Sequence, residues 1–141
     1  MPYREKTAWL ALIAMVITFG PYFAIVAVAQ PHDESLPNLR QLGLFAVAAV
    51  AQMLILCAGH LYLRSRSPQD ARTPPDERDR AIMRRSISFA YYVLIAGMIV
   101  VGCIMPFSFA GWAIINAALL MLVGAEFVHY GVVVVSYRRQ T

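Results

Sequence analysis

The chain has 141 residues, of which 60% are hydrophobic and 14% are charged. A soluble domain carries about a quarter charged residues and less than half apolar ones, so the composition excludes an ordinary soluble protein. The net charge of +4 does not indicate a nucleic-acid partner, because the basic residues flank the apolar segments.

Four apolar segments follow one another along the chain, and each approaches or exceeds the roughly 20 residues that span a hydrocarbon core. We expect transmembrane helices at about residues 7–29, 41–63, 87–105 and 109–137. Little chain remains for a soluble domain. Residues 1–141 are therefore expected to form one all-α integral membrane domain, a four-transmembrane-helix bundle in which residues 64–86 are a cytoplasmic loop.

Eleven of the twelve lysines and arginines fall on one side of the expected membrane. They precede the first span, lie between the second and third spans, or follow the fourth, whereas Arg40 falls in the opposite loop. The positive-inside rule assigns the basic side to the cytoplasm. Both termini are therefore expected to be cytoplasmic.

The first span contains Gly20 and Pro21 near its middle. A proline removes a backbone donor and clashes with the carbonyl one turn back, so we expect a helix kink at this point. Such a kink is either purely structural or takes part in gating or binding, because breaks in membrane helices sometimes line a cavity.

The third span is preceded by a helix start signal, the run PPDERD at residues 74–79. Asp76 is a good N-cap, and Glu77 and Asp79 fall in the first turn, where the helix dipole favours acids. No helix breaker follows before Met105, so we predict one continuous helix of about 29 residues. The first turns of this helix should project into the cytoplasm. They are either a solvated helix end or, together with the C-terminal tail, a docking surface for a cytoplasmic protein. The candidate docking residues are Asp76, Glu77, Arg78, Asp79, Arg138 and Arg139.

The fourth span carries Glu126 and His129. Glu126 lies twelve residues before Arg138, about 18 Å from the cytoplasmic end of the helix at 1.5 Å per residue. An ionisable residue at this depth is costly and usually functional, and its helix face should point inward. Polar residues of the second and third spans reach similar depths, so the expected intramembrane polar cluster is Gln52, His60, Tyr91, Tyr92, Glu126, His129 and Tyr130.

Three interpretations of this cluster stay open. The first is a hydrogen-bonded network that fixes the helix register, with Glu126 protonated. The second makes Glu126 a titrating group for proton-coupled transport or cation binding, although four-span multidrug exporters carry their essential acid in the first span, which is devoid of acids here. The third is a b-type haem held by His60 and His129. A di-iron site is excluded, because its Glu-x-x-His motif needs a second copy and two further glutamates.

The sequence has no motif typical of an enzyme. It contains no serine and general base in a recognisable catalytic arrangement, no Gly-rich phosphate loop and no Cys/His zinc spacing. We therefore expect a protein without catalytic activity, bound metal or cofactor.

The run DERDRAIMRRSISFAYYVLIAGMIV and the later run AEFVHYGVVVVSYRR resemble a group of small, uncharacterised four-span proteins of the bacterial inner membrane. That group combines a cytoplasmic Asp-Glu-Arg-Asp motif before the third span with a last helix that runs into a Tyr-Arg-Arg tail. The resemblance covers about Asp76–Arg139. It implies a multi-pass location in the bacterial inner membrane. It also implies a role in membrane-linked regulation, since members are often encoded beside a helix-turn-helix regulator.

Two functions are therefore expected from the sequence. The first is a non-enzymatic accessory or regulatory protein, embedded in the lipid bilayer, homo-oligomeric and with a cytoplasmic protein partner. The alternative is a small proton-coupled transporter or ligand-binding membrane protein that uses Glu126.

Overall fold

The computed structural model describes residues 3–28, 38–69, 73–109 and 111–139, and these residues form no strand. Within these described ranges, four helical segments are long and apolar enough to cross a membrane. They are α1 (Tyr3–Val28), α2 (Leu39–Arg66), α4 (Glu77–Ile99) with its short continuation, and α5 (Trp112–Arg138). The predicted all-α membrane bundle of four spanning helices is confirmed.

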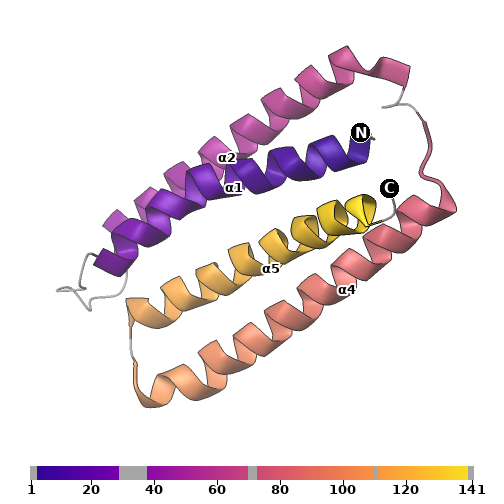
Figure 1. Cartoon of the computed structure of the whole chain (residues 1–141). Coiled ribbons are helices and arrows are strands. Elements are labelled where there is room, and N and C mark those ends of the chain that lie inside the picture. The colour runs from indigo at the N-terminus through magenta and orange to yellow at the C-terminus, as the bar shows by residue number, and fades with distance from the viewer. Residues whose placement is uncertain (1–2, 29–37, 70–72, 110, 140–141) are drawn as a thin grey trace.

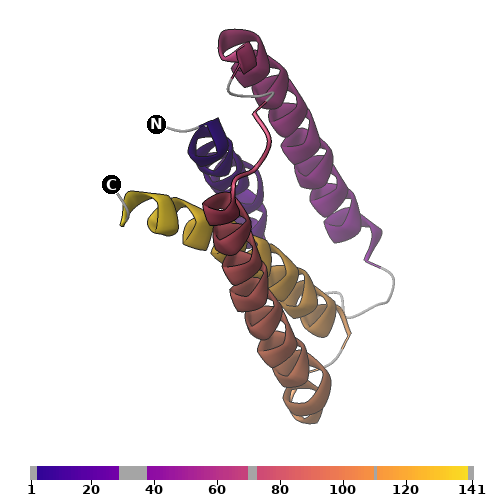
Figure 2. The same cartoon turned by 90° about the vertical axis from the view of Figure 1, so that its right-hand side faces the viewer.

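The four helices lie in the order α2, α1, α5, α4, and each runs antiparallel to its neighbours (Figure 1). Helix α1 packs against both α2 and α5, and α5 also packs against α4. In the turned view, α2 stands apart from α4 (Figure 2). Helices α2 and α4 are therefore the edge helices of the arrangement.

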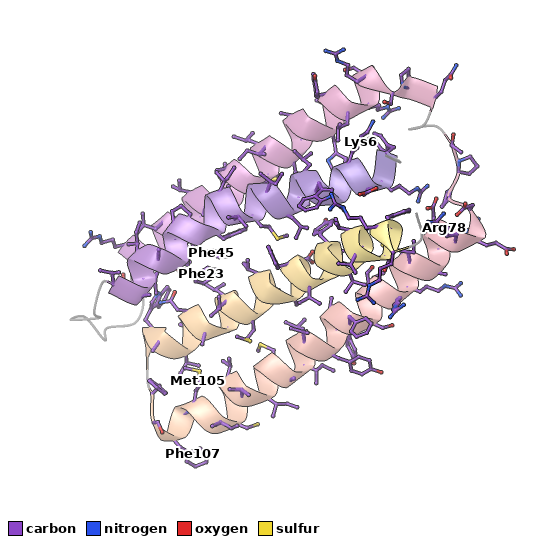
Figure 3. All side chains as sticks on the ribbon, in the orientation of Figure 1. Lys6, Phe23, Phe45, Arg78, Met105 and Phe107 are labelled. Atoms are coloured by element: carbon purple, nitrogen blue, oxygen red, sulfur yellow. The ribbon has the colours of Figure 1, made fainter. Side chains whose placement is uncertain are left out.

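Both chain termini lie at the same end of the bundle (Figure 1). Lys6 and Arg78 also lie there, whereas Met105 and Phe107 lie at the other end (Figure 3). We call the end with the termini the charged end, because it also holds Arg66 and Arg138.

The small residues of α1 let it pack between two neighbours. Ala8, Ala11 and Ala14 are at most 2% exposed, and small side chains allow close helix approach. Near the charged end, one hydrophobic cluster joins α1, α4 and α5: Ala8, Leu12, Ile82, Val133, Val134 and Tyr137. Further along, a second cluster joins α1 to α2: Met15, Phe19, Tyr22 and Ala48.

The predicted start of the helix that contains the third span is confirmed. The Asp76 side chain accepts a hydrogen bond of 2.7 Å from the backbone N–H of Asp79 and caps α4. At its other end the helix does not continue as a regular α-helix to Met105. It becomes a π-helix at Val100–Ile104 and a 3-10 helix at Met105–Phe107, because Pro106 has no N–H for the next α-helical bond.

Several predicted boundaries move by a few residues. Helix α2 continues to Arg66, so the cytoplasmic stretch expected at 64–86 begins with helical residues, and its residues from Glu77 onward belong to α4, in agreement with the predicted helix start. Helix α5 begins at Trp112, after Gly111, whose φ of 60° favours glycine. Helix α1 runs through Gly20 and Pro21 as one element, and the kink there stays a prediction.

Candidate functional site

Glu126 lies on an exposed side of α5, in a groove of about 420 Å³ between α4 and α5. The expectation that Glu126 points into the bundle is wrong, because its side chain is exposed. Farther along the same helix face, Tyr130 packs against both hydrophobic clusters and Val133 is buried. Helix α5 also buries Ala125 and Val134. The residues that line the groove are Met83, Ile87, Ala90, Tyr91 and Leu94 of α4, and Leu122, Ala125, Glu126, His129 and Tyr130 of α5.

The groove is mostly apolar, and its polar groups come from four side chains. Tyr91 enters from α4, and Glu126, His129 and Tyr130 enter from α5. The rings of His129 and Tyr130 make an edge-to-face contact, with centroids 4.9 Å apart. Glu126 makes no hydrogen bond and no ion pair within the part of the chain that the structure describes. The expected hydrogen-bonded network around Glu126 is therefore not formed.

Two members of the expected polar cluster lie on α2, away from Glu126. Gln52 is buried between α2 and α1, where its Oε1 accepts a hydrogen bond of 2.8 Å from the Thr18 hydroxyl. His60 is exposed, and its Nδ1 lies 2.9 Å from the carbonyl oxygen of Leu56 in its own helix. Since α1 lies between α2 and α5, the structure does not support a haem held by His60 and His129.

Tyr92 also lies outside the groove. Its side chain is 68% exposed, and its ring contacts that of Tyr91 edge to face, with centroids 6.0 Å apart. The seven predicted residues therefore separate into a groove set of Tyr91, Glu126, His129 and Tyr130, and three residues placed elsewhere.

A polar connection at the end opposite the charged end was not expected from the sequence. The hydroxyl of Tyr22 donates a hydrogen bond of 2.7 Å to Oδ1 of Asn116, and Nδ2 of Asn116 donates one of 2.7 Å to Oε1 of Gln41. This connection joins α1, α5 and α2. The sequence signal that could have predicted this connection is the similar depth of three amide or hydroxyl side chains in three different spans.

At the charged end, a set of ionic contacts ties α1 to the ends of α4 and α5. Arg4 pairs with Asp79 at 3.1 Å, and the hydroxyl of Tyr137 donates a hydrogen bond to the same carboxylate. Arg138 lies 3.7 Å from the carboxylate of Glu5, which is 7% exposed. We call Arg4, Glu5, Asp79, Tyr137 and Arg138 the terminal clasp.

The clasp uses part of the predicted docking surface for contacts within the chain. Asp79 and Arg138 are clasp residues, and Asp76 caps α4. The guanidinium of Arg78 lies 6.0 Å from the ring centroid of Tyr137. Glu77 and Arg139 are exposed, with Arg139 on a different groove.

A small cavity of about 90 Å³ lies between the clasp and the Glu126 groove. Its lining includes Arg4 and Asp79 of the clasp. It shares Met83, His129 and Tyr130 with the groove, so the two spaces adjoin. Polar side chains therefore continue from the charged end to the level of Glu126.

No three histidine, cysteine, aspartate or glutamate side chains gather at a metal-binding distance in the described residues. Comparisons with protein-family models, curated proteins and solved structures find no match. The fold and its four spanning helices define a small multi-pass membrane protein.

Proposed function

We propose that this protein binds lipophilic cations from the membrane and that Glu126 is their counter-ion. The observation that supports this function best is a carboxyl without a partner among the described residues, in a mostly apolar groove of about 420 Å³. Small-molecule sites are typically about 300–1,000 Å³, apolar, and equipped with a few polar groups that orient the ligand.

The chemistry of the groove favours a positive ligand. Among the described residues that line the groove, Glu126 is the only acid and none is an arginine or a lysine. Tyr91 and Tyr130 supply aromatic rings, whose faces attract cations. The apolar remainder suits a ligand with a large hydrocarbon or aromatic body.

The same carboxyl can carry a proton when no cation is bound. A charge at membrane depth is expensive unless it is paired, so the proton and the cation compete for Glu126. The adjoining cavity beside His129 supports a route by which the proton exchanges with the charged end. Proton-coupled transport would use this competition between the proton and the cation for Glu126. The proposed activity involves no catalysis, metal or cofactor.

The distribution of basic residues supports an orientation with the charged end in the cytoplasm. We therefore propose a bacterial inner membrane protein with both termini inside the cell. The resemblance of Asp76–Arg139 to small inner-membrane proteins supports the same location.

Binding of tetraphenylphosphonium to the purified protein, measured by isothermal titration calorimetry in detergent, tests the proposal. We expect Glu126→Gln to weaken binding about tenfold or more, a loss of about 1.4 kcal/mol. Leu122→Trp should also weaken it, because this side chain lines the groove. Glu77→Gln is the matched control, since Glu77 is an exposed acid outside the groove. Equal affinity of Glu126→Gln and the wild type would exclude Glu126 as the counter-ion.

An accessory or regulatory role is the second candidate function. It is supported by the exposed start of α4, where Glu77, Arg78, Arg80 and Arg84 are solvent-accessible. Within this proposal the protein is homo-oligomeric, because a second copy would cover an unpaired acid at membrane depth. Charge reversal at Glu77 should then release a co-purifying cytoplasmic partner, whereas Glu126→Gln should retain it.

A further inference from the structure

A second groove, of about 400 Å³, lies on another side of the α4–α5 pair. It shares no lining residue with the Glu126 groove. Its walls are mainly apolar, with Phe89 of α4 and Phe127 and Val135 of α5 among them. Arg85 of α4 and Arg139 of α5 also line it.

The length of this groove matches one leaflet of a bilayer. Along α5 its lining runs from Arg139 to Phe127, which is twelve residues or about 18 Å. Half of a hydrocarbon core is about 15 Å thick. Because Arg139 follows the last turn of α5, the groove begins at the charged end and enters the membrane from there.

The polar groups of the groove suit an anion. The described residues that line it include two arginines and one serine but no acid. The guanidinium of Arg85 lies 5.7 Å from the ring centroid of Phe89, which holds it beside the groove. Neither Arg85 nor Arg139 forms an ion pair with any residue that the structure describes. Guanidinium groups bind phosphate oxygens with strong, charge-assisted hydrogen bonds.

We propose that this groove binds an anionic phospholipid of the leaflet at the charged end. The phosphate pairs with Arg85 and Arg139, which line the groove together with Ser136, and an acyl chain extends along Phe89 and Phe127. Basic pockets between membrane helices recognise anionic headgroups in this way. The site is independent of the cation-binding function proposed above.

Gly131 supplies a way to block the groove without disturbing the helix packing. It lines the groove, and a Cβ atom added to it meets no other atom within 4 Å. Gly124→Leu is the matched control, because Gly124 lies in the same helix, a Cβ atom added to it also meets no neighbour within 4 Å, and it is outside the lining.

Arg66 is the matched control for the arginines. It lies at the charged end of α2, and its guanidinium is 5.7 Å from the ring centroid of Tyr62, as that of Arg85 is from Phe89. It takes no part in the groove.

Native mass spectrometry of the delipidated protein, titrated with phosphatidylglycerol or with phosphatidylcholine of the same chains, tests the proposal. We expect phosphatidylglycerol to bind about tenfold more tightly, in keeping with a charge-assisted headgroup contact. The double variant Arg85→Gln/Arg139→Gln should lose this preference, and Gly131→Leu should weaken the binding of both lipids. Arg66→Gln and Gly124→Leu should bind like the wild type, with circular dichroism confirming that every variant is folded.

Three binding results and one change of oligomeric state would overturn the proposal. The first is equal binding of the two lipids by the wild type, and the second is a loss of preference in Arg66→Gln as large as in the double variant. The third is competition by soluble glycerol phosphate as strong as that by the lipid, which would indicate a phosphate site without an acyl-chain groove. A change from oligomer to monomer in Gly131→Leu would instead assign the groove to a second copy.

Discussion

Tyr137 in the last turn of α5 donates a hydrogen bond to the carboxylate of Asp79 in the first turn of α4. The same carboxylate pairs with Arg4 of α1, so one acid links three helices. Asp79 therefore fixes the charged end of the bundle, close to the small cavity that leads toward Glu126.

Replacing Asp79 with asparagine should destabilise the protein. The variant loses the ion pair with Arg4. The Arg4 side chain is 34% exposed and that of Asp79 is 19% exposed, so solvent partly screens this interaction. We expect a loss of about 1–2 kcal/mol in the free energy of unfolding, since hydrogen bonds to charged groups contribute somewhat more than neutral ones. Unfolding in mixed detergent micelles, followed by circular dichroism, measures it.

Glu77→Gln is the control for that measurement. Glu77 also lies in the first turn of α4 but is exposed, so its replacement should change the stability by less than about 0.5 kcal/mol. Similar losses in Asp79→Asn and Glu77→Gln would show that the clasp contributes nothing beyond the general effect of an acid at this helix end.

The contact of α4 with α5 depends on Gly97. A Cβ atom added there would overlap the end of the Met121 side chain and lie 3.0 Å from its Cβ, so that side chain would have to change its rotamer and the helix contact would have to give by a few tenths of an ångström. We expect Gly97→Ala to lower the stability by about 1–3 kcal/mol through overpacking. Gly124→Ala, which meets no neighbour, should not lower it. Thermal unfolding of the two variants compares them, and an unchanged Gly97→Ala variant would contradict the close packing.

Tyr91 and Tyr92 form a matched pair for the proposed cation site. Tyr91 lines the groove, whereas Tyr92 does not. Tyr91→Leu should weaken the binding of tetraphenylphosphonium by about 0.5–2 kcal/mol, because it removes an aromatic face, and Tyr91→Phe should preserve it. Tyr92→Leu should leave the calorimetric affinity unchanged. An equal effect of the two leucine substitutions would place the ligand outside the groove.

The spans and the start of α4 could be predicted because each depends on a local pattern. The length of each apolar segment predicts a spanning helix, and Asp76 before Glu77 predicts the N-cap of α4. The order in which the helices pack could not be predicted. Each span is apolar on nearly all sides, so its pattern does not tell which side meets another helix and which side meets lipid.

The same limit explains the outcome for the polar cluster. The depth of each residue along its helix predicted that Tyr91 and Glu126 lie at similar levels in the membrane, and both side chains line one groove. Depth says nothing about neighbours, and α1 separates Gln52 and His60 from α5. The predicted orientation of Glu126 was wrong, because small residues such as Ala125, rather than the acid, occupy the buried side of α5.

Labelling of Glu126 by dicyclohexylcarbodiimide, an apolar reagent for membrane carboxyl groups, tests the central claim most directly. The protein in lipid nanodiscs is labelled with and without tetraphenylphosphonium, and the modified residue is located by peptide mass spectrometry. An accessible groove with a cation site predicts that Glu126 is labelled and that the cation protects it over the same concentrations at which it binds. Labelling that the cation leaves unchanged, or a Glu126 that is never labelled, would contradict the account.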